Sequence, residues 1–344
     1  GNYPTGTDNV AMGNTALDSV QAGGINNTAI GDNAGTAITT GDCNTAVGKD
    51  ALDASTTASY NTAIGFNSLT TNTTGNLNTA VGMGSAQQNT EGTNLVAVGA
   101  RALEQNITGS CNTALGKNSL LSNTTADNNT AVGFSSLCAN TTGTNNVAVG
   151  CGALLSNTTG CCNTAIGRNA LDANTTANHN TAVGMSSLGA NTTGTANTAL
   201  GKDSLATNST GGNNVAVGNC ALAVNTASNN VAVGTSALIA NTTGANNVGV
   251  GRNALQNNQT GASNVAVGNC ALQDNTGSSN TAVGQETLLQ NTSGAYNAAF
   301  GFEALKNNTT AQNNSAFGTC ALKFNTTGDE NVAMGSSTLD ANTT

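Results

Sequence analysis

Charged and aromatic residues are scarce in this chain of 344 residues. Asp, Glu, Lys and Arg together make up 7% of it and aromatic residues 3%, with no Trp, one Pro and one His. An ordinary globular core of this size uses more large apolar residues, whereas disordered chains are rich in charge and proline. The composition therefore argues against both classes. It favours a repetitive chain that buries small and β-branched side chains in a narrow core.

Basic residues and long apolar runs are also lacking. Only eight Lys and Arg residues are present, the net charge is −9, and the basic residues are scattered. Nucleic-acid binding needs clustered cations to neutralise phosphates, and a membrane span needs about 20 apolar residues in succession. We therefore expect neither a nucleic-acid partner nor membrane insertion by this segment. Because the sequence begins and ends within a repeat, we expect it to be a segment of a longer fibre.

Catalytic and metal-binding constellations are missing as well. The single histidine, His179, has no serine, cysteine or carboxylate arranged around it in the sequence, and the carboxylates lie at variable positions. Glycine-rich stretches recur without the lysine and the strand-to-helix context of a phosphate-binding loop. A calcium-binding β-roll needs Asp at a fixed position of its repeat, and no column of this repeat holds Asp. A structural zinc site needs Cys and His at short regular spacings, and the only close cysteine pair is Cys161–Cys162. We expect no enzyme activity, no cofactor and no metal.

What the sequence does contain is one 17-residue unit, N-T-A-V-G-x-x-A-L-x-x-N-T-T-G-x-x, repeated twenty times without linkers. One spacing is 18 residues and two are 16. Tandem self-similarity at a fixed period is the mark of a solenoid. The copies start at Asn9, Asn27, Asn44, Asn61, Asn78, Leu95, Asn112, Asn129, Asn146, Asn163, Asn180, Asn197, Asn214, Asn230, Asn247, Asn264, Asn280, Asn297, Asn314 and Asn331.

Within the unit, some positions are nearly invariant and others vary freely. Position 5 is Gly in all twenty copies, position 3 is Ala in nineteen, position 9 is Leu in eighteen and position 12 is Asn in seventeen. Such strict columns indicate coils stacked in register. The residues that we assign to these structural columns include Ala46, Gly48, Leu52, Ala63, Gly65, Leu69, Asn72, Ala131, Gly133, Leu137 and Asn140.

Residues 1–5 of each copy predict a strand, in which positions 2 and 4 share one face and positions 3 and 5 the other. We expect the β-branched residues of positions 2 and 4 inside the coil, against the Leu of position 9. The Ala/Gly pair would then face outward and let another backbone approach. The reverse orientation, with Ala inside a very thin coil, is the alternative. The N-T-T-G at positions 12–15 predicts a turn with a left-handed Gly, and the Asn column predicts a side-chain ladder.

The predicted fold is therefore all-β, a parallel β-solenoid of about twenty 17-residue coils forming one repetitive domain over residues 1–344. Each coil would bury only about three sizeable side chains, a small hydrophobic contribution for 17 ordered residues. We therefore expect self-association, as a homotrimer or a filament.

Two further residue sets are candidates for covalent chemistry. Cysteines recur at matching positions three or more coils apart, too far to bridge within the chain. They are either free surface thiols or small filling residues, or candidates for inter-chain disulfides: Cys43, Cys111, Cys161, Cys162, Cys220, Cys270 and Cys320. The N-x-S/T sequons at position 12 are candidates for sparse N-glycosylation, although the turn already explains these residues: Asn72, Asn106, Asn123, Asn140, Asn157 and Asn174.

Residues 213–222, NNVAVGNCAL, resemble the N-S-V-A-I-G-x-x-S-x-A unit of trimeric autotransporter adhesin heads. Residues 61–75, NTAIGFNSLTTNTTG, are similar to repeat regions of phage tail-fibre-like proteins. The resemblance implies a left-handed parallel β-roll wound from three chains and displayed on a cell surface or a virion. The adhesin unit is shorter, so each coil of this chain has a longer loop.

We therefore expect an extracellular structural or adhesive fibre, either an adhesin head or stalk or a tail-fibre shaft. It would bind surfaces through many weak contacts. No residue pattern identifies a receptor on a cell or host surface. A purely structural filament or matrix protein is one alternative, and an ice-binding β-solenoid, which would display a flat grid of Thr, is another.

Overall fold

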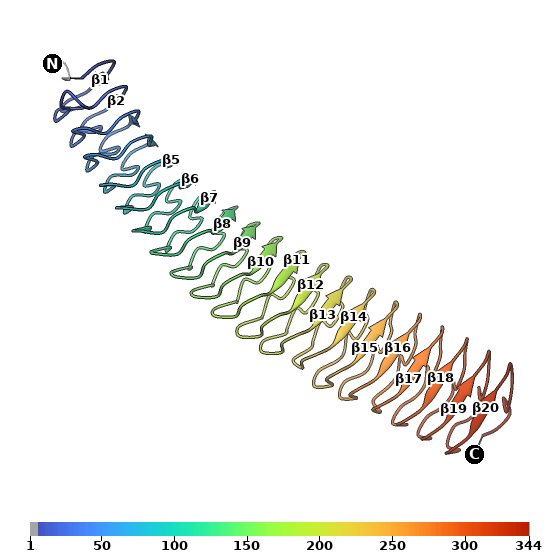
Figure 1. The fold of residues 1–344 in the computed structure, drawn as a ribbon. Coiled ribbons are helices and arrows are strands. Elements are labelled where there is room, and N and C mark those ends of the chain that lie inside the picture. Colours follow the sequence, from blue (N-terminus) through green and yellow to red (C-terminus); the bar gives the residue numbers. More distant parts are fainter. Residues whose placement is uncertain (1–5, 344) are drawn as a thin grey trace. The chain divides into compact units, whose positions relative to one another are not determined.

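The computed structural model describes residues 6–343, and every regular element in that range is a β-strand. The chain divides into two compact units, Gly1–Ala177 and Asn178–Thr344. Both are built from the same coil, in which residues 2–4 of the repeat form a three-residue strand and turns and loops complete the circuit (Figure 1). The prediction of an all-β parallel solenoid is confirmed.

Ten strands belong to the first unit: β1 (Val10–Met12), β2 (Thr28–Ile30), β3 (Thr45–Val47), β4 (Thr62–Ile64), β5 (Thr79–Val81), β6 (Val96–Val98), β7 (Thr113–Leu115), β8 (Thr130–Val132), β9 (Val147–Val149) and β10 (Thr164–Ile166). Ten belong to the second: β11 (Thr181–Val183), β12 (Thr198–Leu200), β13 (Val215–Val217), β14 (Val231–Val233), β15 (Val248–Val250), β16 (Val265–Val267), β17 (Thr281–Val283), β18 (Ala298–Phe300), β19 (Ser315–Phe317) and β20 (Val332–Met334).

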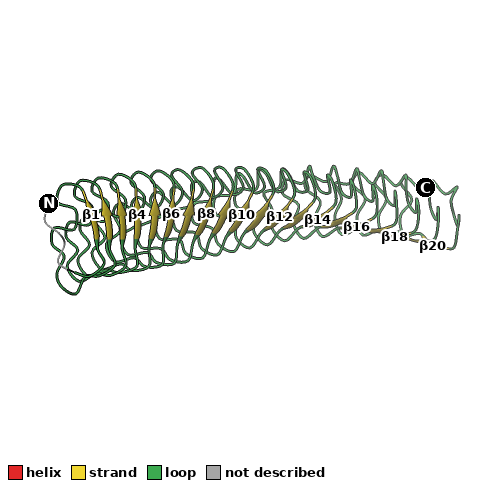
Figure 2. Cartoon of the chain, turned by 90° about the horizontal axis from the view of Figure 1, so that it is seen from above, coloured by secondary structure: helices red, strands yellow, loops and turns green. Residues whose placement is uncertain are grey.

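Within each unit, every strand pairs in parallel with the strand of the next coil, residue for residue. Thr45 pairs with Thr62 and Ala46 with Ala63, for example, so each repeat position forms a column along the stack. The shorter coils keep this register, because β13 and β14 pair at Val215 and Val231 although only 16 residues separate them. Figure 2 shows the strands side by side, with loops forming the rest of each coil.

The predicted orientation of the strands is wrong: Ala faces inward, and positions 2 and 4 face outward. Ala63 and Ala131 have no exposed surface, whereas Ile64 is 38% exposed. The interior is too narrow for anything larger at position 3. At Gly249, the one exception to Ala, an added Cβ would lie only 3.3 Å from Leu238 Cδ1 of the preceding coil. Leu at position 9 fills the core, as predicted, and Leu52, Leu69 and Leu137 are fully buried.

The positive-φ glycine is at position 5 rather than in the N-T-T-G turn. Gly48, Gly65 and Gly133 have φ of 130°, 136° and 131°, a region that other residues avoid. In the turn, Gly75 lies outside the positive-φ region, so the predicted left-handed turn glycine is wrong there. Crowding accounts for Gly75 instead, because a Cβ would lie 2.3 Å from the carbonyl oxygen of Gly92 in the next coil.

Each unit contains two ladders of buried Asn side chains. At position 12, Nδ2 of each Asn donates to Oδ1 of the Asn one coil earlier, over 2.7–3.0 Å from Asn72 to Asn174 and 2.6–3.5 Å from Asn191 to Asn342. This confirms the predicted ladder, of which Asn72 and Asn140 are members.

Sequence analysis missed the second ladder, at position 1. There the backbone N–H of Asn61 donates to Oδ1 of Asn44, and the Asn61 amide donates to the carbonyl of Gly75 in its own coil. Asn72 donates to the same carbonyl, over 2.9 Å. Both ladders thus close the turn and satisfy buried polar groups that would otherwise be costly.

Candidate functional site

The most extensive chemical feature of the described surface is the outward side of the strands, which we call the strand face: the side chains at positions 2 and 4 of β1–β20. No residue at these positions is charged. Position 4 is always apolar and half-exposed or exposed, as at Leu115 and Leu200, whose exposed fractions are 46% and 47%. In-register pairing repeats these side chains from strand to strand, at the roughly 4.8 Å spacing of a sheet. The result, within each unit, is a regular uncharged strip whose position-4 column is apolar throughout.

The composition of the strand face differs along the chain. In β2–β5, position 2 is Thr in four successive strands, so hydroxyl groups alternate with Val and Ile. In β13–β16, both outward positions are Val in four successive strands. In β18 and β19, Phe300 and Phe317 stack at position 4, with ring centroids 5.0 Å apart and planes 5° apart. The β2–β5 part of the face therefore carries a hydroxyl group on every strand, whereas β13–β16 offer only hydrocarbon.

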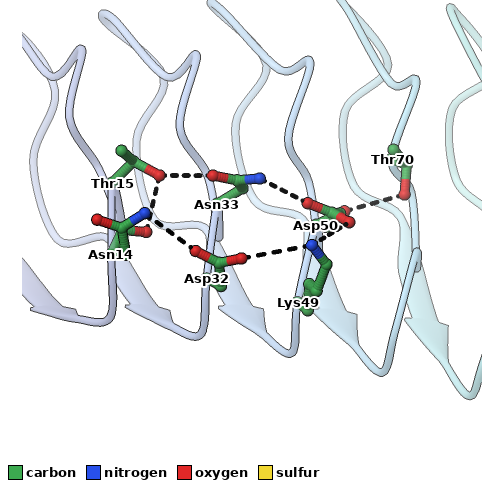
Figure 3. A network of polar contacts seen from close by, with 7 residues as sticks. All are labelled: Asn14, Thr15, Asp32, Asn33, Lys49, Asp50 and Thr70. Carbon is green, nitrogen blue, oxygen red and sulfur yellow. Dashed lines mark hydrogen bonds and ion pairs between the residues drawn. The ribbon is translucent and has the colours of Figure 1, made fainter.

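Polar side chains at positions 6 and 7 border the strand face in the first coils. Lys49 Nζ lies 3.3 Å from Asp32 and 3.6 Å from Asp50, and the Asn33 amide donates to Asp50 over 2.9 Å. Thr15 and Asn14 extend this network into the preceding coil (Figure 3). The residues come from successive coils, so these contacts link coils across the surface. Such exposed ion pairs contribute little to stability.

A second charged cluster, at positions 7 and 10, lies in the C-terminal unit. Lys306 Nζ is 2.6 Å from both Glu286 and Glu303, and Lys323 Nζ is 2.6 Å from Glu303. Hydrogen bonds from Lys306 and Lys323 lower the pKa of Glu303 to about 2. The cluster holds three neighbouring coils together by charge, and it is confined to the surface.

A small cavity of about 180 Å³ lies beside the strand face at Gly84. It is lined by Phe66 and Met83 at position 6, by Asn67 and Arg101 at position 7, and by Gln87 and Glu104 at position 10. Sequence analysis did not single out these residues. The sequence feature that could have pointed to this cavity is the Gly at position 7, where most copies carry a side chain.

None of the nine cysteines forms a disulfide within the chain. Cys43, Cys111 and Cys162 are exposed, while Cys161 and the position-7 cysteines Cys220, Cys270 and Cys320 are half-buried. The structure thus leaves several thiols accessible to another chain, and their inter-chain bonding stays a prediction.

The position-12 sequons are placed where a glycan does not fit. Asn72, Asn106, Asn123, Asn140, Asn157 and Asn174 have no exposed surface. Their Nδ2 atoms, the atoms that a glycan would modify, donate hydrogen bonds within the core, as Asn106 does to Asn89 and to the carbonyl of Gly109. A glycan on Nδ2 would remove a donor and need space that the packed coil does not have. The structure therefore argues against glycosylation at these positions.

Other sites considered from the sequence show no assembled chemistry. His179 is exposed at position 17 of its coil. Within residues 6–343, no three His, Cys, Asp or Glu side chains group together as a metal site would require. The same part of the chain has no helix of the length and apolar character needed to cross a bilayer. No protein-family model matches the chain, and the search of curated proteins finds no match.

Proposed function

We propose that this protein is an extracellular structural or adhesive fibre, an adhesin head or stalk or a tail-fibre shaft, whose chains associate through the strand face as a homotrimer. The observation that carries this proposal is the uncharged strip on the outward side of the strands in each unit, whose position-4 side chains are all apolar and at least half-exposed. Contiguous exposed apolar surface of this kind marks interaction sites in soluble proteins.

The dimensions of the strip support association. Ten three-residue strands at about 4.8 Å spacing, each about 10 Å long, give each unit an outward face on the order of 400 Å². That is already as large as the largest patch on a typical monomer. The face of one unit is therefore about half of the roughly 800 Å² per partner that a standard protein interface buries.

The thin core gives a second reason for association. Each regular coil buries one Leu, an Ala and a further small residue at position 8, beside its two Asn side chains. Covering the half-exposed Val, Ile, Leu and Phe of position 4 with a second and third chain would add apolar burial at about 25 cal/mol per Å². A strip with a regular repeat suits copies of the same chain, because their strips have the same spacing.

Native mass, measured by light scattering with and without reductant, tests the proposal. We expect a trimer under both conditions. The variant Val217→Lys/Val250→Lys places two ammonium groups on β13 and β15 without touching the core, and should yield monomers. Val224→Lys is the matched control, because Val224 is also exposed but lies at position 11, outside the strand face. A wild-type monomer would refute association through this face, and a mass that falls on reduction would assign assembly to the thiols.

Ice binding is a second candidate, because the outward orientation places Thr side chains on the solvent side. Thr28, Thr45, Thr62 and Thr79 are half-exposed in four consecutive in-register strands. Freezing-point hysteresis of the wild type and of Thr62→Leu tests it. Hysteresis that the substitution removes, in a monomeric protein, would favour ice binding over the fibre. A structural or adhesive fibre should show no freezing-point hysteresis.

A further inference from the structure

Gly84 interrupts a column of outward side chains. Position 7 has positive φ in every described coil, 64° at Gly84, and it usually carries Asn, Ser, Asp, Glu or Cys. The missing side chain leaves open space between Asn67 and Arg101, which occupy position 7 of the preceding and following coils. We call this space the Gly84 notch.

One side of the notch is apolar and accessible. Phe66 is 48% exposed and Met83 52% exposed, and both lie at position 6 of adjacent coils. An exposed ring and a thioether side by side offer a flat hydrocarbon surface of the kind that ligand pockets use to bury an apolar face.

The opposite side is polar and preorganised. Arg101 holds Glu104 through two contacts to Oε2, from Nε at 2.8 Å and from Nη2 at 2.7 Å. Glu104 Oε1 lies 3.8 Å from the point where a Gly84 Cβ would be, and Gln87 Oε1 lies 3.3 Å from it. Two side-chain oxygens therefore lie at the floor of the notch, and Asn67 adds an amide to its wall.

These groups define the chemistry of a ligand. The Arg101–Glu104 pair cancels its own charge, and no other charged residue lines the cavity. A ligand with one apolar face and several hydroxyl groups matches the lining, whereas an anion or a cation has no uncompensated partner. The volume of about 180 Å³ lies below the range of drug-sized sites and restricts the ligand to a single small ring.

We propose that the Gly84 notch binds one neutral pyranose unit of a glycan. The apolar ring face lies on Phe66 and Met83, and hydroxyl groups donate to Gln87 and Glu104. This inference deepens the adhesive form of the proposed function and rests on it. A shallow single-ring site binds weakly, and copies on associated chains would raise the effective affinity.

Gly152 provides an internal control. It is the other glycine at position 7, with φ of 68°, but Asn169 Oδ1 lies 2.7 Å from its would-be Cβ and occupies the space. Its position-6 neighbour is Cys151 rather than Met or Phe. The same backbone geometry therefore occurs there without a notch.

The test uses the full chain with methyl β-galactopyranoside and methyl α-glucopyranoside as neutral probes and N-acetylneuraminic acid as an anionic one. Saturation-transfer NMR and titration should show millimolar binding of at least one neutral glycoside. Gly84→Asn fills the notch with a residue that the same column already holds at Asn67 and Asn118, and should weaken binding at least tenfold. Phe66→Ala should do the same, while Gly152→Asn should leave binding unchanged.

Three outcomes would overturn the proposal: no saturation transfer from either neutral glycoside, binding that survives Gly84→Asn, or preference for the anionic sugar. Circular dichroism of each variant checks the fold. None of the three substitutions lies at position 2 or 4, so native mass reports on chain association separately. A trimer without sugar binding would refute the notch alone, and a sugar-binding monomer would refute the fibre alone.

Discussion

The first three coils of the N-terminal unit close differently from the coils that follow them. Position 12 is Val20, Ile38 and Ser55 in the first three, and Asn in every coil from Asn72 onward. Val20 and Ile38 are buried apolar groups, whereas the later coils carry a continuous amide ladder. The backbone course is the same in both regions, because β1–β4 pair in register like the rest.

Ile38 shows how the first region manages without the ladder. Its coil has Gly35 in place of the usual Leu at position 9, and a Cβ on Gly35 would lie 2.9 Å from Ile38 Cδ1. The Ile side chain therefore fills volume that Leu fills elsewhere. The comparison teaches that position 12 is interchangeable between hydrocarbon and amide, provided that volume and hydrogen bonds are satisfied. The position-1 ladder is common to both regions and continues through the difference, from Asn9 to Asn27 to Asn44.

The largest loss of stability should follow from placing an apolar residue at position 12 in the coils that carry the Asn ladder. Asn123→Leu removes the donor to Asn106 Oδ1 and the acceptor of Asn140 Nδ2, which are now bonded over 2.8 and 3.0 Å. Buried groups that lose partners cost about 1–3 kcal/mol each, so we expect a loss of about 4 kcal/mol. Urea unfolding measures the loss, and hydrogen exchange should localise it to neighbouring coils.

Asn94→Leu is the matched control for that substitution. Asn94 is exposed at position 17 with φ of 57°, and Leu77 occupies the same position one coil earlier with φ of 60°. The change of side chain is identical, and only the preference of Asn for positive φ is lost, so stability should change by about 1 kcal/mol. Equal losses from both substitutions would contradict a special role for the ladder.

The next effect comes from a double-mutant cycle at Gly35 and Ile38. Gly35→Leu should overpack the core against Ile38 and cost about 2 kcal/mol. Ile38→Asn should leave a cavity beside Gly35 and cost a similar amount. Together they recreate the Leu and Asn of the later coils, so the double variant should lose less than either single one. If the losses of the two single variants simply add in the double variant, as measured by thermal or urea unfolding, Ile38 does not fill the space that Leu at position 9 fills in other coils.

A smaller, stabilising effect should come from extending the ladder by one coil. Ser55 Oγ is buried and has no hydrogen-bond partner among the described residues, and Asn72 begins the ladder above it. Ser55→Asn would give Asn72 Nδ2 a second acceptor, beside the carbonyl of Gly75, and should raise the free energy of unfolding by about 1 kcal/mol. Ser55→Ala separates this gain from simple removal of the unpaired hydroxyl. A gain no larger than that of Ser55→Ala would rule out ladder extension.

The smallest effect on stability should come from the charged cluster of Glu286, Glu303, Lys306 and Lys323, which lies on the surface, whereas the Asn ladder is buried. Hydrogen bonds from Lys306 and Lys323 lower the pKa of Glu303 to about 2, against about 4.3 in an unfolded chain. Its stabilising contribution is therefore present above about pH 4.3 and is lost as the pH falls toward 2. Because the cluster is on the surface, we expect under about 1 kcal/mol. Carboxyl NMR titration of the wild type, compared with Glu303→Gln, measures the pKa of Glu303. A pKa near 4.3 would contradict stabilisation of the carboxylate by the cluster.

Sequence analysis recovered the period, the coil starts, the buried Leu column and the position-12 ladder, because each is a local pattern repeated many times. It assigned the wrong face of the strand to the core. Strand alternation separates Thr45 and Val47 from Ala46 but does not say which set faces inward. β-branched residues usually belong to cores, and here Ala46 is buried and Val47 half-exposed. The Gly84 notch was missed because it is defined by neighbours one coil away.

The stacking of similar coils in register could be predicted from the sequence alone, since a strict 17-residue repeat with invariant Gly and nearly invariant Ala and Leu gives every coil the same course. The width of that coil depends on contacts between coils. A Cβ built on Gly249 would already lie 3.3 Å from Leu238 Cδ1, so little room is left at position 3 beyond a methyl group. That distance, which depends on residues in adjacent coils, turns the β-branched side chains outward and creates the strand face on which the proposed assembly depends.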